Sequence, residues 1–362
     1  MKVLTVSDSF KGTLSSSLIG ELVSEHYAKE GHETSYIPIS DGGEGFLDVI
    51  KYIKKLEFLS ITVKGPYFKD TQAKYLYDEV DKTAYVELAE TSGLPKVKKE
   101  DLRAPFASTY GLGELIKHII LKHQPKKVVM GIGGSATTDV GSGMLEAMGV
   151  EFIERLGFKV TGLNNAKLMQ ARKLNTKKFQ KLIKGIEFVT LTDVENPLLG
   201  SLGTVSVFAP QKGATEEDQP VMERNVQHFY NLTNKLHKKN APDFKGAGAA
   251  GGVGYAMKYF FNSKITSGIE EILRLVEFDK LVEENDVIIT GEGSFDSQSL
   301  NGKVISGIQG YNPKRLVIIC GRCKIENPEV EVYPIVPSVA TAEESMGQPK
   351  ESLLKLLNTI KL

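Results

Sequence analysis

The chain has 362 residues, of which 41% are hydrophobic, so it can bury large cores, and its length favours two domains over one. Lysine plus arginine and aspartate plus glutamate both number 45, so the formal net charge is zero and gives no electrostatic reason to expect nucleic acid or an acidic membrane as a partner. We find no secretory signal and no apolar run long enough to span a bilayer. Two cysteines cannot make a disulfide scaffold, so we expect a cytoplasmic protein.

The first strand is predicted over residues 1–6 and leads into the loop SDSFKGTLSS and a helix over 15–29. This loop gathers Asp8, Ser9 and Lys11 at the carboxyl end of a parallel strand, where open α/β sheets bind their ligands. Capping of the helix accounts for the hydroxyl groups of the loop. It does not account for Asp8 or Lys11.

A second strand over 34–39 opens the loop SDGGEGF before a helix over 46–53. Two β-loop-α units in succession predict a doubly wound parallel sheet. Asp41 and Glu44 stand among three glycines, which suits carboxylates that accept from a ligand hydroxyl or a metal-bound water. A plain turn before a helix is the alternative.

From Leu59 the apolar pattern changes to a period of two, which predicts an antiparallel meander. A helix over 108–123 then leads to a buried strand over 126–130 and the loop GIGGSATTD. Gly133, Gly134 and Ser135 are typical of a loop whose backbone N–H groups approach phosphate, with the positive end of a helix over 142–148 behind them. The same loop fits a G-x-G-x-x-A dinucleotide pattern and also a tight turn without a ligand.

Three further polar loops follow predicted strands. The strand over 187–191 opens TDVENPLLG, which holds Asp193 and Asn196 on a bend before Pro197. A strand over 204–208 precedes APQKGAT with Lys212. A strand over 286–290 opens GEGSFDSQSLNGK, in which Glu292 and Asp296 follow a strand end as magnesium-holding carboxylates often do.

Two other patterns are weaker. GAGAAGG at 246–252 matches G-x-G-x-x-G, but no strand precedes it, so it reads either as a loop that approaches a small substrate or as close helix packing. Cys320 and Cys323 form C-x-x-C at the end of a predicted strand over 316–320, and the absence of a second cysteine pair favours a structural role. Beyond a strand over 332–336, a last helix begins with a capping box formed by Thr341 and Glu344.

Taken together, seven loops in this order resemble those of the bacterial two-domain glycerate kinases: DSFKGTLS, SDGGEG, GIGGSATTD, TDVENPLLG, PQKGA, GAGAAGG and ITGEGSFDSQSLNGK. The resemblance covers nearly the whole chain. It implies ATP-dependent phosphorylation of D-glycerate, commonly at the 2-hydroxyl to give 2-phosphoglycerate, by a Rossmann-like domain joined to a second α/β domain. ATP and Mg²⁺ are the implied cofactors.

The chain departs from the family pattern at three positions. Relatives usually have Asn and Gly where this chain has Thr138 and Val140, and they usually have Arg where it has Ser294. A positive charge that relatives can offer to phosphate or carboxylate is therefore missing at Ser294. Arg322 replaces this charge only if the fold places it close by.

We assign the following roles for phosphoryl transfer. Asp193 is the candidate to accept the substrate hydroxyl proton, and Asp41 is the second candidate for this role. Lys11 and Lys212 are expected to hold the glycerate carboxylate or the transferred group. The remaining assignments are Gly133, Gly134, Ser135 and Lys303 for the nucleotide phosphates, Glu292 and Asp296 for Mg²⁺, and Asp8, Ser9, Asn196 and Arg322 for the substrate.

The parallel-sheet segments 1–58, 104–150 and 276–362 are assigned to the Rossmann-like domain, and 59–103 and 151–275 to a second α/β domain with an antiparallel or mixed sheet. The pattern leaves open which domain holds the strand over 126–130. We expect the active site in the cleft between the two domains. The sequence does not distinguish the 2-hydroxyl from the 3-hydroxyl as the phosphorylated group, and it does not define the oligomeric state.

Two other functions remain open from the sequence. One is an NAD(P)-dependent oxidoreductase of a small hydroxy acid, which needs an acidic ribose partner about 20 residues after the glycine loop. No such residue stands at a clear strand end after Gly149. The other is a non-catalytic nucleotide or metabolite sensor on the same scaffold, which would explain Ser294.

Overall fold

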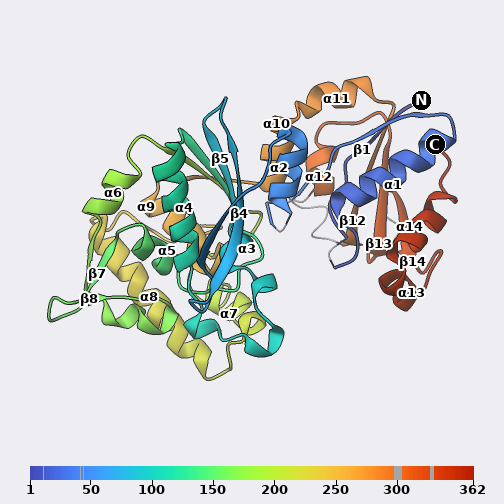
Figure 1. Ribbon diagram of the computed structural model, residues 1–362. Coiled ribbons are helices and arrows are strands. Elements are labelled where there is room, and N and C mark those ends of the chain that lie inside the picture. The colour runs from blue at the N-terminus through green and yellow to red at the C-terminus, as the bar shows by residue number, and fades with distance from the viewer. Residues whose placement is uncertain (11, 41, 44, 297–303, 327–329) are drawn as a thin grey trace. The chain divides into compact units, whose positions relative to one another are not determined.

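The computed structural model describes residues 1–10, 12–40, 42–43, 45–296, 304–326 and 330–362. The chain forms two compact units (Figure 1). Unit 1 combines Met1–Asp41 with Ser267–Leu362, and unit 2 is the continuous segment Gly42–Thr266. Within the described residues, no helix combines the length and the apolar character needed to cross a membrane.

Unit 1 is built on a parallel sheet of five strands. In spatial order these are β14 (Glu331–Val336), β13 (Leu316–Cys323), β12 (Val287–Phe295), β1 (Lys2–Thr5) and β2 (Glu33–Tyr36). Counted along this unit, the chain runs outward from β1 to β2 on one side and to β12 on the other. The direction of winding therefore reverses between β1 and β12, and the carboxyl ends at such a switch point are where doubly wound sheets bind ligands.

Helices cover both faces of this sheet. The alternating side chains Val287 and Ile289 pack with α1 (Ser16–Lys29) and α14 (Pro349–Leu357), whereas Ile318 packs with α12 (Val304–Gln309) on the other face. The remaining helices of the unit are α10 (Gly268–Leu275), α11 (Phe278–Glu284) and α13 (Ala342–Gly347). The predicted doubly wound parallel sheet is confirmed.

Unit 2 contains a mixed sheet of six strands. In spatial order they are β11 (Lys264–Thr266), β10 (Glu187–Leu191), β6 (Lys127–Gly131), β5 (Thr83–Glu87), β4 (Asp70–Asp78) and β3 (Leu59–Lys64). The first four are parallel, and β4 and β3 continue the sheet as an antiparallel meander. The predicted meander and the second α/β domain with a mixed sheet are confirmed.

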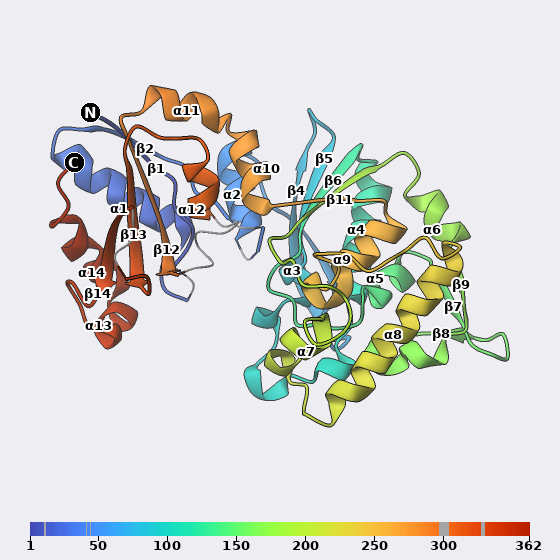
Figure 2. The same cartoon turned by 180° about the vertical axis from the view of Figure 1, so that it is seen from behind.

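Helices and a small antiparallel sheet complete unit 2. The helices are α2 (Phe46–Lys54), α3 (Ala89–Ser92), α4 (Tyr110–His123), α5 (Ser142–Ala147), α6 (Lys177–Leu182), α7 (Thr204–Phe208), α8 (Asp218–Leu236) and α9 (Ala249–Phe260). The small sheet, which the sequence analysis missed, has the order β8 (Lys159–Val160), β7 (Glu151–Ile153) and β9 (Lys173–Asn175). The long helix α8 runs beside it (Figure 2). Short 3₁₀ helices are η1 (Leu94–Lys96), η2 (Lys99–Asp101), η3 (Ala104–Phe106), η4 (Asn165–Gln170) and η5 (Pro210–Lys212).

The division of the chain differs from the expected one. Residues 104–150 lie in unit 2, because β6 pairs with β5 on one side and with β10 on the other. The helix α2 also belongs to unit 2, where it packs on β4 and β5, and so does not cover the sheet that contains β2. The change to a period of two at Leu59 suggested a separate unit, whereas the meander and the buried strand β6 belong to one sheet.

Two local predictions are also wrong. Residues 204–208 form α7 instead of a strand, because the β-branched run packs against α8 and α9, and this packing overrides its strand propensity. The expected last helix is two helices. The capping box of Thr341 and Glu344 starts α13, as predicted, but Pro349 begins α14, which carries the apolar stripe.

The two cysteines lie on the same strand, three residues apart, which places them about 10 Å from each other and too far for a disulfide. Cys320 is fully buried, and this burial, with smaller contributions from Cys323 and Glu292, raises the pKa of its thiol to about 12. Cys323 is partly exposed. Both features fit a structural role.

We expect a thiol reagent such as Ellman's reagent to modify one cysteine of the native protein, Cys323, and both after unfolding in urea. Burial protects Cys320 and keeps it as an unreactive thiol. Rapid modification of both thiols in the native state would contradict this placement.

Candidate active site

The glycine loop after β6 is held by close contact between backbones. A Cβ atom on Gly131 would lie 2.5 Å from the carbonyl oxygen of Gly42, and one on Gly133 would lie 2.4 Å from Cα of Gly43. The N–H of Gly133 donates to the same carbonyl of Gly42 at 3.4 Å. The glycines are therefore required by packing against the SDGGEG loop, whatever the loop binds.

The polar half of the loop is organised by Asp139. Its buried carboxylate accepts from the N–H and Oγ1 of Thr109 at 2.9 and 2.8 Å, and from the N–H groups of Gly141 and Gly143 at 3.2 and 3.1 Å. Burial raises the pKa of Asp139, and these donors oppose the rise. We predicted that the positive end of α5 would face a bound phosphate. This detail is wrong, because the carboxylate of Asp139 already occupies that helix terminus.

Lys212 is brought to this loop from η5. Its ammonium donates to Oγ of Ser135 and to the carbonyl oxygen of Thr137, both at 2.7 Å. The side chain is 2% exposed, and burial lowers its pKa to about 7, against the attraction of Asp139. Since both hydrogen-bond partners are neutral, the charged form of Lys212 is stabilised further by any anion that reaches it. The structure thus joins two residues that the sequence analysis placed in one site.

A third segment, residues 250–252 near the start of α9, packs against the glycine loop. Ala250, Gly251 and Gly252 have positive φ angles of 53°, 70° and 90°, and the N–H of Val140 donates to the carbonyl of Gly251 at 3.0 Å. Val140 itself has φ of 55°, which is strained for a β-branched residue and explains why glycine suits this position. The run 246–252 thus serves close backbone packing, one of its two expected readings.

Asp193 lies two residues beyond β10, the neighbour of β6. The N–H of Ile132 donates to the carbonyl of Leu191 at 3.3 Å, so the loops that hold Gly133 and Asp193 leave adjacent strand ends. Asn196 makes hydrogen bonds within unit 2. Its side-chain amide donates to the backbone carbonyl of Leu202 at 2.9 Å, and its backbone carbonyl accepts from the N–H groups of Gly246 and Gly248.

In unit 1, the loop after β1 lies beside β12 at the switch point. Asp8 N–H donates to the carbonyl of Gly291 at 3.0 Å, which continues the pairing of the strands and sets Asp8 next to Glu292. The carboxylate of Asp8 accepts from the N–H of Ser9 at 2.7 Å. Asp8 and Ser9, two of the three residues that the sequence analysis grouped in this loop, thus lie at the carboxyl end of the sheet.

Glu292 and Asp296 are less close than a shared metal requires. β12 continues to Phe295, so the two carboxylates are separated by about 13 Å of extended chain, and Asp296 pairs with Lys324 at 3.6 Å. No cluster of three or more potential metal ligands occurs among the described residues. Asp8 and Glu292 fit Mg²⁺ better, since this ion binds one or two carboxylates and completes its shell with phosphate oxygens and water.

Arg322 lies directly beside Ser294, because the two are register partners on β13 and β12. The side chain of Arg322 is exposed. The sequence analysis required Arg322 to lie close to Ser294 if it is to replace the missing charge, and the fold places it there. Arg322 therefore carries a positive charge next to the position where relatives have arginine. Lys11, Asp41 and Lys303 lie outside the described residues.

Glu87 was missed by the sequence analysis. This last residue of β5 is 5% exposed, and its carboxylate accepts from the N–H groups of Gly45 and Leu47 at 3.3 and 3.2 Å. The available signal was an acidic residue that ends an otherwise apolar strand, TAYVE.

These features define the class of the protein. The dinucleotide interpretation does not fit, since the helix should follow the glycine pattern at once, whereas ten residues separate the end of β6 at Gly131 from the start of α5 at Ser142. What remains is an α/β protein with carboxylates at the switch point of one unit and a buried lysine on a glycine loop of the other, the groups that phosphoryl transfer uses.

Comparison with known proteins identifies the family. Residues 3–361 match the Glycerate kinase family, so the chain belongs to this family and is a kinase. It is 31% identical to the glycerate 2-kinase of Escherichia coli K12 over 99% of this chain and 97% of that protein. It is 36% identical to a Bacillus cereus glycerate kinase over 85% of this chain and 81% of that protein. A crystal structure assigned as glycerate kinase 2 from Salmonella typhimurium LT2 aligns with a TM-score of 0.83 at 27% identity, covering 99% and 96% of the two chains.

The contact between Gly251 and the glycine loop can be tested by Gly251→Ala. The new Cβ would lie 1.9 Å from the carbonyl oxygen of Thr137, so we expect a loss of about 3 kcal/mol or more in the free energy of unfolding. Gly157→Ala is the matched control, since Gly157 also has positive φ but no described atom lies within 4 Å of its Cβ position, and it should cost only about 1 kcal/mol. Equal losses in urea unfolding would contradict the packing.

The burial of Lys212 predicts a pH-dependent stability. Its pKa falls from 10.5 in the unfolded chain to about 7, so its contribution to stability is present above pH 10.5 and is lost as the pH falls toward 7. Relative to Lys212→Met, the wild type should therefore lose on the order of 1 kcal/mol per pH unit as the pH is lowered from about 9 to about 7. Urea unfolding at several pH values measures this difference, and a constant difference would show that Lys212 remains solvated.

Proposed function

We propose that this protein transfers the γ-phosphate of ATP to the 2-hydroxyl of D-glycerate, forming 2-phosphoglycerate and ADP. The full-length match to the Glycerate kinase family carries this proposal, and the similarity to a protein named glycerate 2-kinase favours the 2-hydroxyl. The 3-hydroxyl is the alternative position, and analysis of the product distinguishes the two.

The residues of unit 2 provide an anion site and a base. Lys212 donates to Ser135 and Thr137 and offers its positive charge to an anionic group of the substrate or to the transferred phosphoryl group. Its two partners are neutral and burial removes water from the ammonium, so an anion would stabilise the charge. Gly134 and Ser135 offer backbone N–H groups of the same loop to phosphate, and Gly133, whose own N–H donates to Gly42, shapes the loop around it. To Asp193, at the neighbouring strand end, we assign acceptance of the hydroxyl proton as the phosphoryl group leaves ATP.

The residues of unit 1 provide carboxylates. Asp8 and Glu292 would hold Mg²⁺, which when bound neutralises charge on the phosphates. Ser9 and Arg322 offer a hydroxyl and a guanidinium to substrate oxygens, and Arg322 stands where it supplies the charge absent at Ser294. The expected roles of Lys11, Asp41 and Lys303 remain part of this proposal, as do cytoplasmic location and closure of the two units over the substrates.

The first test is ADP release in a coupled assay with D-glycerate, L-glycerate, D-lactate and glycolate as acceptors. We expect turnover with D-glycerate above all others and a ³¹P NMR signal of 2-phosphoglycerate. A binding protein without turnover would show affinity for ATP but no release of ADP above background. Turnover with another hydroxy acid alone would reject D-glycerate as the substrate.

We expect Asp193→Asn to lower kcat by ~10²-fold or more, with little change in KM for ATP, because the amide cannot accept the hydroxyl proton. Asp218→Asn is a suitable control, since Asp218 is the first residue of α8 and its carboxylate accepts from the N–H and Oγ1 of Thr215, outside the loops assigned to the reaction. Wild-type turnover by Asp193→Asn would remove Asp193 from this role.

A further inference from the structure

The chain enters unit 2 at the described residues 42–43 and 45–47, which are called residues 42–47 below without including residue 44, and the backbone of Gly42 and Gly43 lies against the glycine loop. Gly42 accepts from Gly133, and Gly43 fills the space beside it. Gly45, with φ of 88°, is the N-cap of α2 and has no side chain to satisfy the first N–H groups of the helix. Glu87, which lies about 40 residues further along the chain, accepts from the N–H groups of Gly45 and Leu47, and the N–H of Phe46 donates to the carbonyl of Gly43.

Glu87 also belongs to the segment that holds the other side of the glycine loop. It is the register partner of Gly131, and the next residue, Leu88, donates to the carbonyl of Gly131 at 2.9 Å. Beyond it, Leu94 N–H donates to the carbonyl of Gly134 at 2.8 Å, and Ser92 accepts from Ala136 at 2.8 Å. One continuous segment, 87–94, therefore binds residues 131–136 by its backbone and residues 45–47 by the Glu87 carboxylate.

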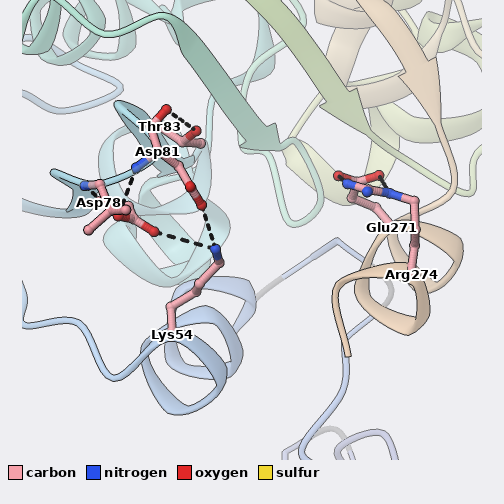
Figure 3. Close-up of polar contacts among 7 residues, drawn as sticks. Lys54, Asp78, Asp81, Thr83, Glu271 and Arg274 are labelled. Atoms are coloured by element: carbon pink, nitrogen blue, oxygen red, sulfur yellow. Dashed lines mark hydrogen bonds and ion pairs between the residues drawn. The ribbon is translucent and has the colours of Figure 1, made fainter. Parts of the chain in front are cut away.

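The other end of α2 is also fixed within unit 2. The ammonium of Lys54 lies 2.7 Å from Asp81 and 3.4 Å from Asp78 in the turn between β4 and β5, as Figure 3 shows. This pair is partly exposed, so it contributes less than about 1 kcal/mol. Of the two attachments, the buried one at Glu87 determines where the start of α2 lies.

We propose that Glu87 is a positioning residue of this kinase: its carboxylate sets residues 42–47 against the glycine loop and thereby fixes the loop for phosphoryl transfer. Glu87 acts through backbone N–H groups and need not touch the substrate. Its effect on turnover rests on the proposed function, whereas its effect on the docking of residues 42–47 does not.

The ionisation of Glu87 gives the proposal a distinctive readout. The pKa of Glu87 is raised to about 7: burial is the largest cause, Glu90 and Asp48 add to the rise, and the N–H groups of Leu47 and Gly45 oppose it. Glu90 lies on α3 and is itself paired with Lys96 at 3.6 Å, and Asp48 lies on α2. If residues 42–47 undock, the carboxylate meets water and its pKa returns toward 4.5. Docking is therefore strongest below pH 4.5 and weakens as the pH rises through 7.

Hydrogen exchange of the full-length protein tests the docking. The amides of residues 45–47 should lose protection, after correction for intrinsic exchange, as the pH rises from about 6 to about 9. Glu87→Gln keeps the size of the side chain but cannot ionise. The ratio of wild-type to Glu87→Gln protection should therefore fall at least tenfold, by the order of one pKa unit, over this interval.

Kinetics test the consequence for catalysis. At pH 6 to 7, we expect Glu87→Gln to lower kcat at least tenfold with less than a threefold change in KM for ATP, since a displaced loop misaligns bound phosphate. The ratio of wild-type to mutant kcat should shrink as the pH rises. Glu90→Gln is the control, because Glu90 is acidic and close by but bonds to Lys74 and Lys96 instead of residues 42–47.

The outcomes separate the two proposals. Protection and kcat ratios that stay constant with pH, or equal effects of Glu87→Gln and Glu90→Gln, would overturn the positioning role. If the wild type itself has no turnover with D-glycerate, the proposed function fails, while the exchange data still decide the role of Glu87. If Glu87→Gln does not fold, the pH course of wild-type protection at residues 45–47 decides it alone.

Discussion

The buried carboxylate of Asp139 is the constraint on which the rest of unit 2 depends. Four donors converge on it, two from Thr109 and two from the start of α5, and they fix the course of the chain between the glycine loop and that helix. This course carries Val140 into a strained conformation and turns the carbonyl of Thr137 toward Lys212. A carboxyl group at full burial is stable only when its oxygens are hydrogen-bonded in this way, so the loop has little freedom to adopt another shape.

A rigid loop built from glycines has a second consequence. Gly131 and Gly133 let two backbone segments meet without side chains between them, and the contacts of Gly251 do the same on the opposite side. Side chains that enter this region must therefore come from outside the loop. Lys212 and Glu87 do so, one as a cation and the other as an acid, and burial moves the pKa of each to about 7. Both groups thus change charge in the pH range where a small change in environment alters their state.

The sequence predicted the elements better than their grouping. Strands with continuous apolar runs, such as β6 and β10, and the helix α1 with its serine cap were found because their patterns are local. The assignment of residues 104–150 failed because pairing of β6 with β5 is a long-range contact that no local pattern records. In the candidate site, the polar loop and Lys212 were each identified from the sequence. The hydrogen bond between them could not be predicted, because it depends on how the chain folds. Glu87 was missed because its partners, two backbone N–H groups, have no side-chain signature.

The loops to which we assign the reaction carry acidic side chains in unit 1 and a buried lysine in unit 2. At the switch point of unit 1, Asp8 and Glu292 bring two acidic side chains to a sheet edge, the position to which we assign Mg²⁺ in the proposed function. In unit 2, the positive charge is already part of the protein as Lys212, and a carboxylate or phosphate can meet it directly. Transfer of a phosphoryl group from a metal-bound triphosphate to an organic acid uses both kinds of charge, because a carboxylate-rich site alone would repel the acid and a basic site alone would not retain the metal.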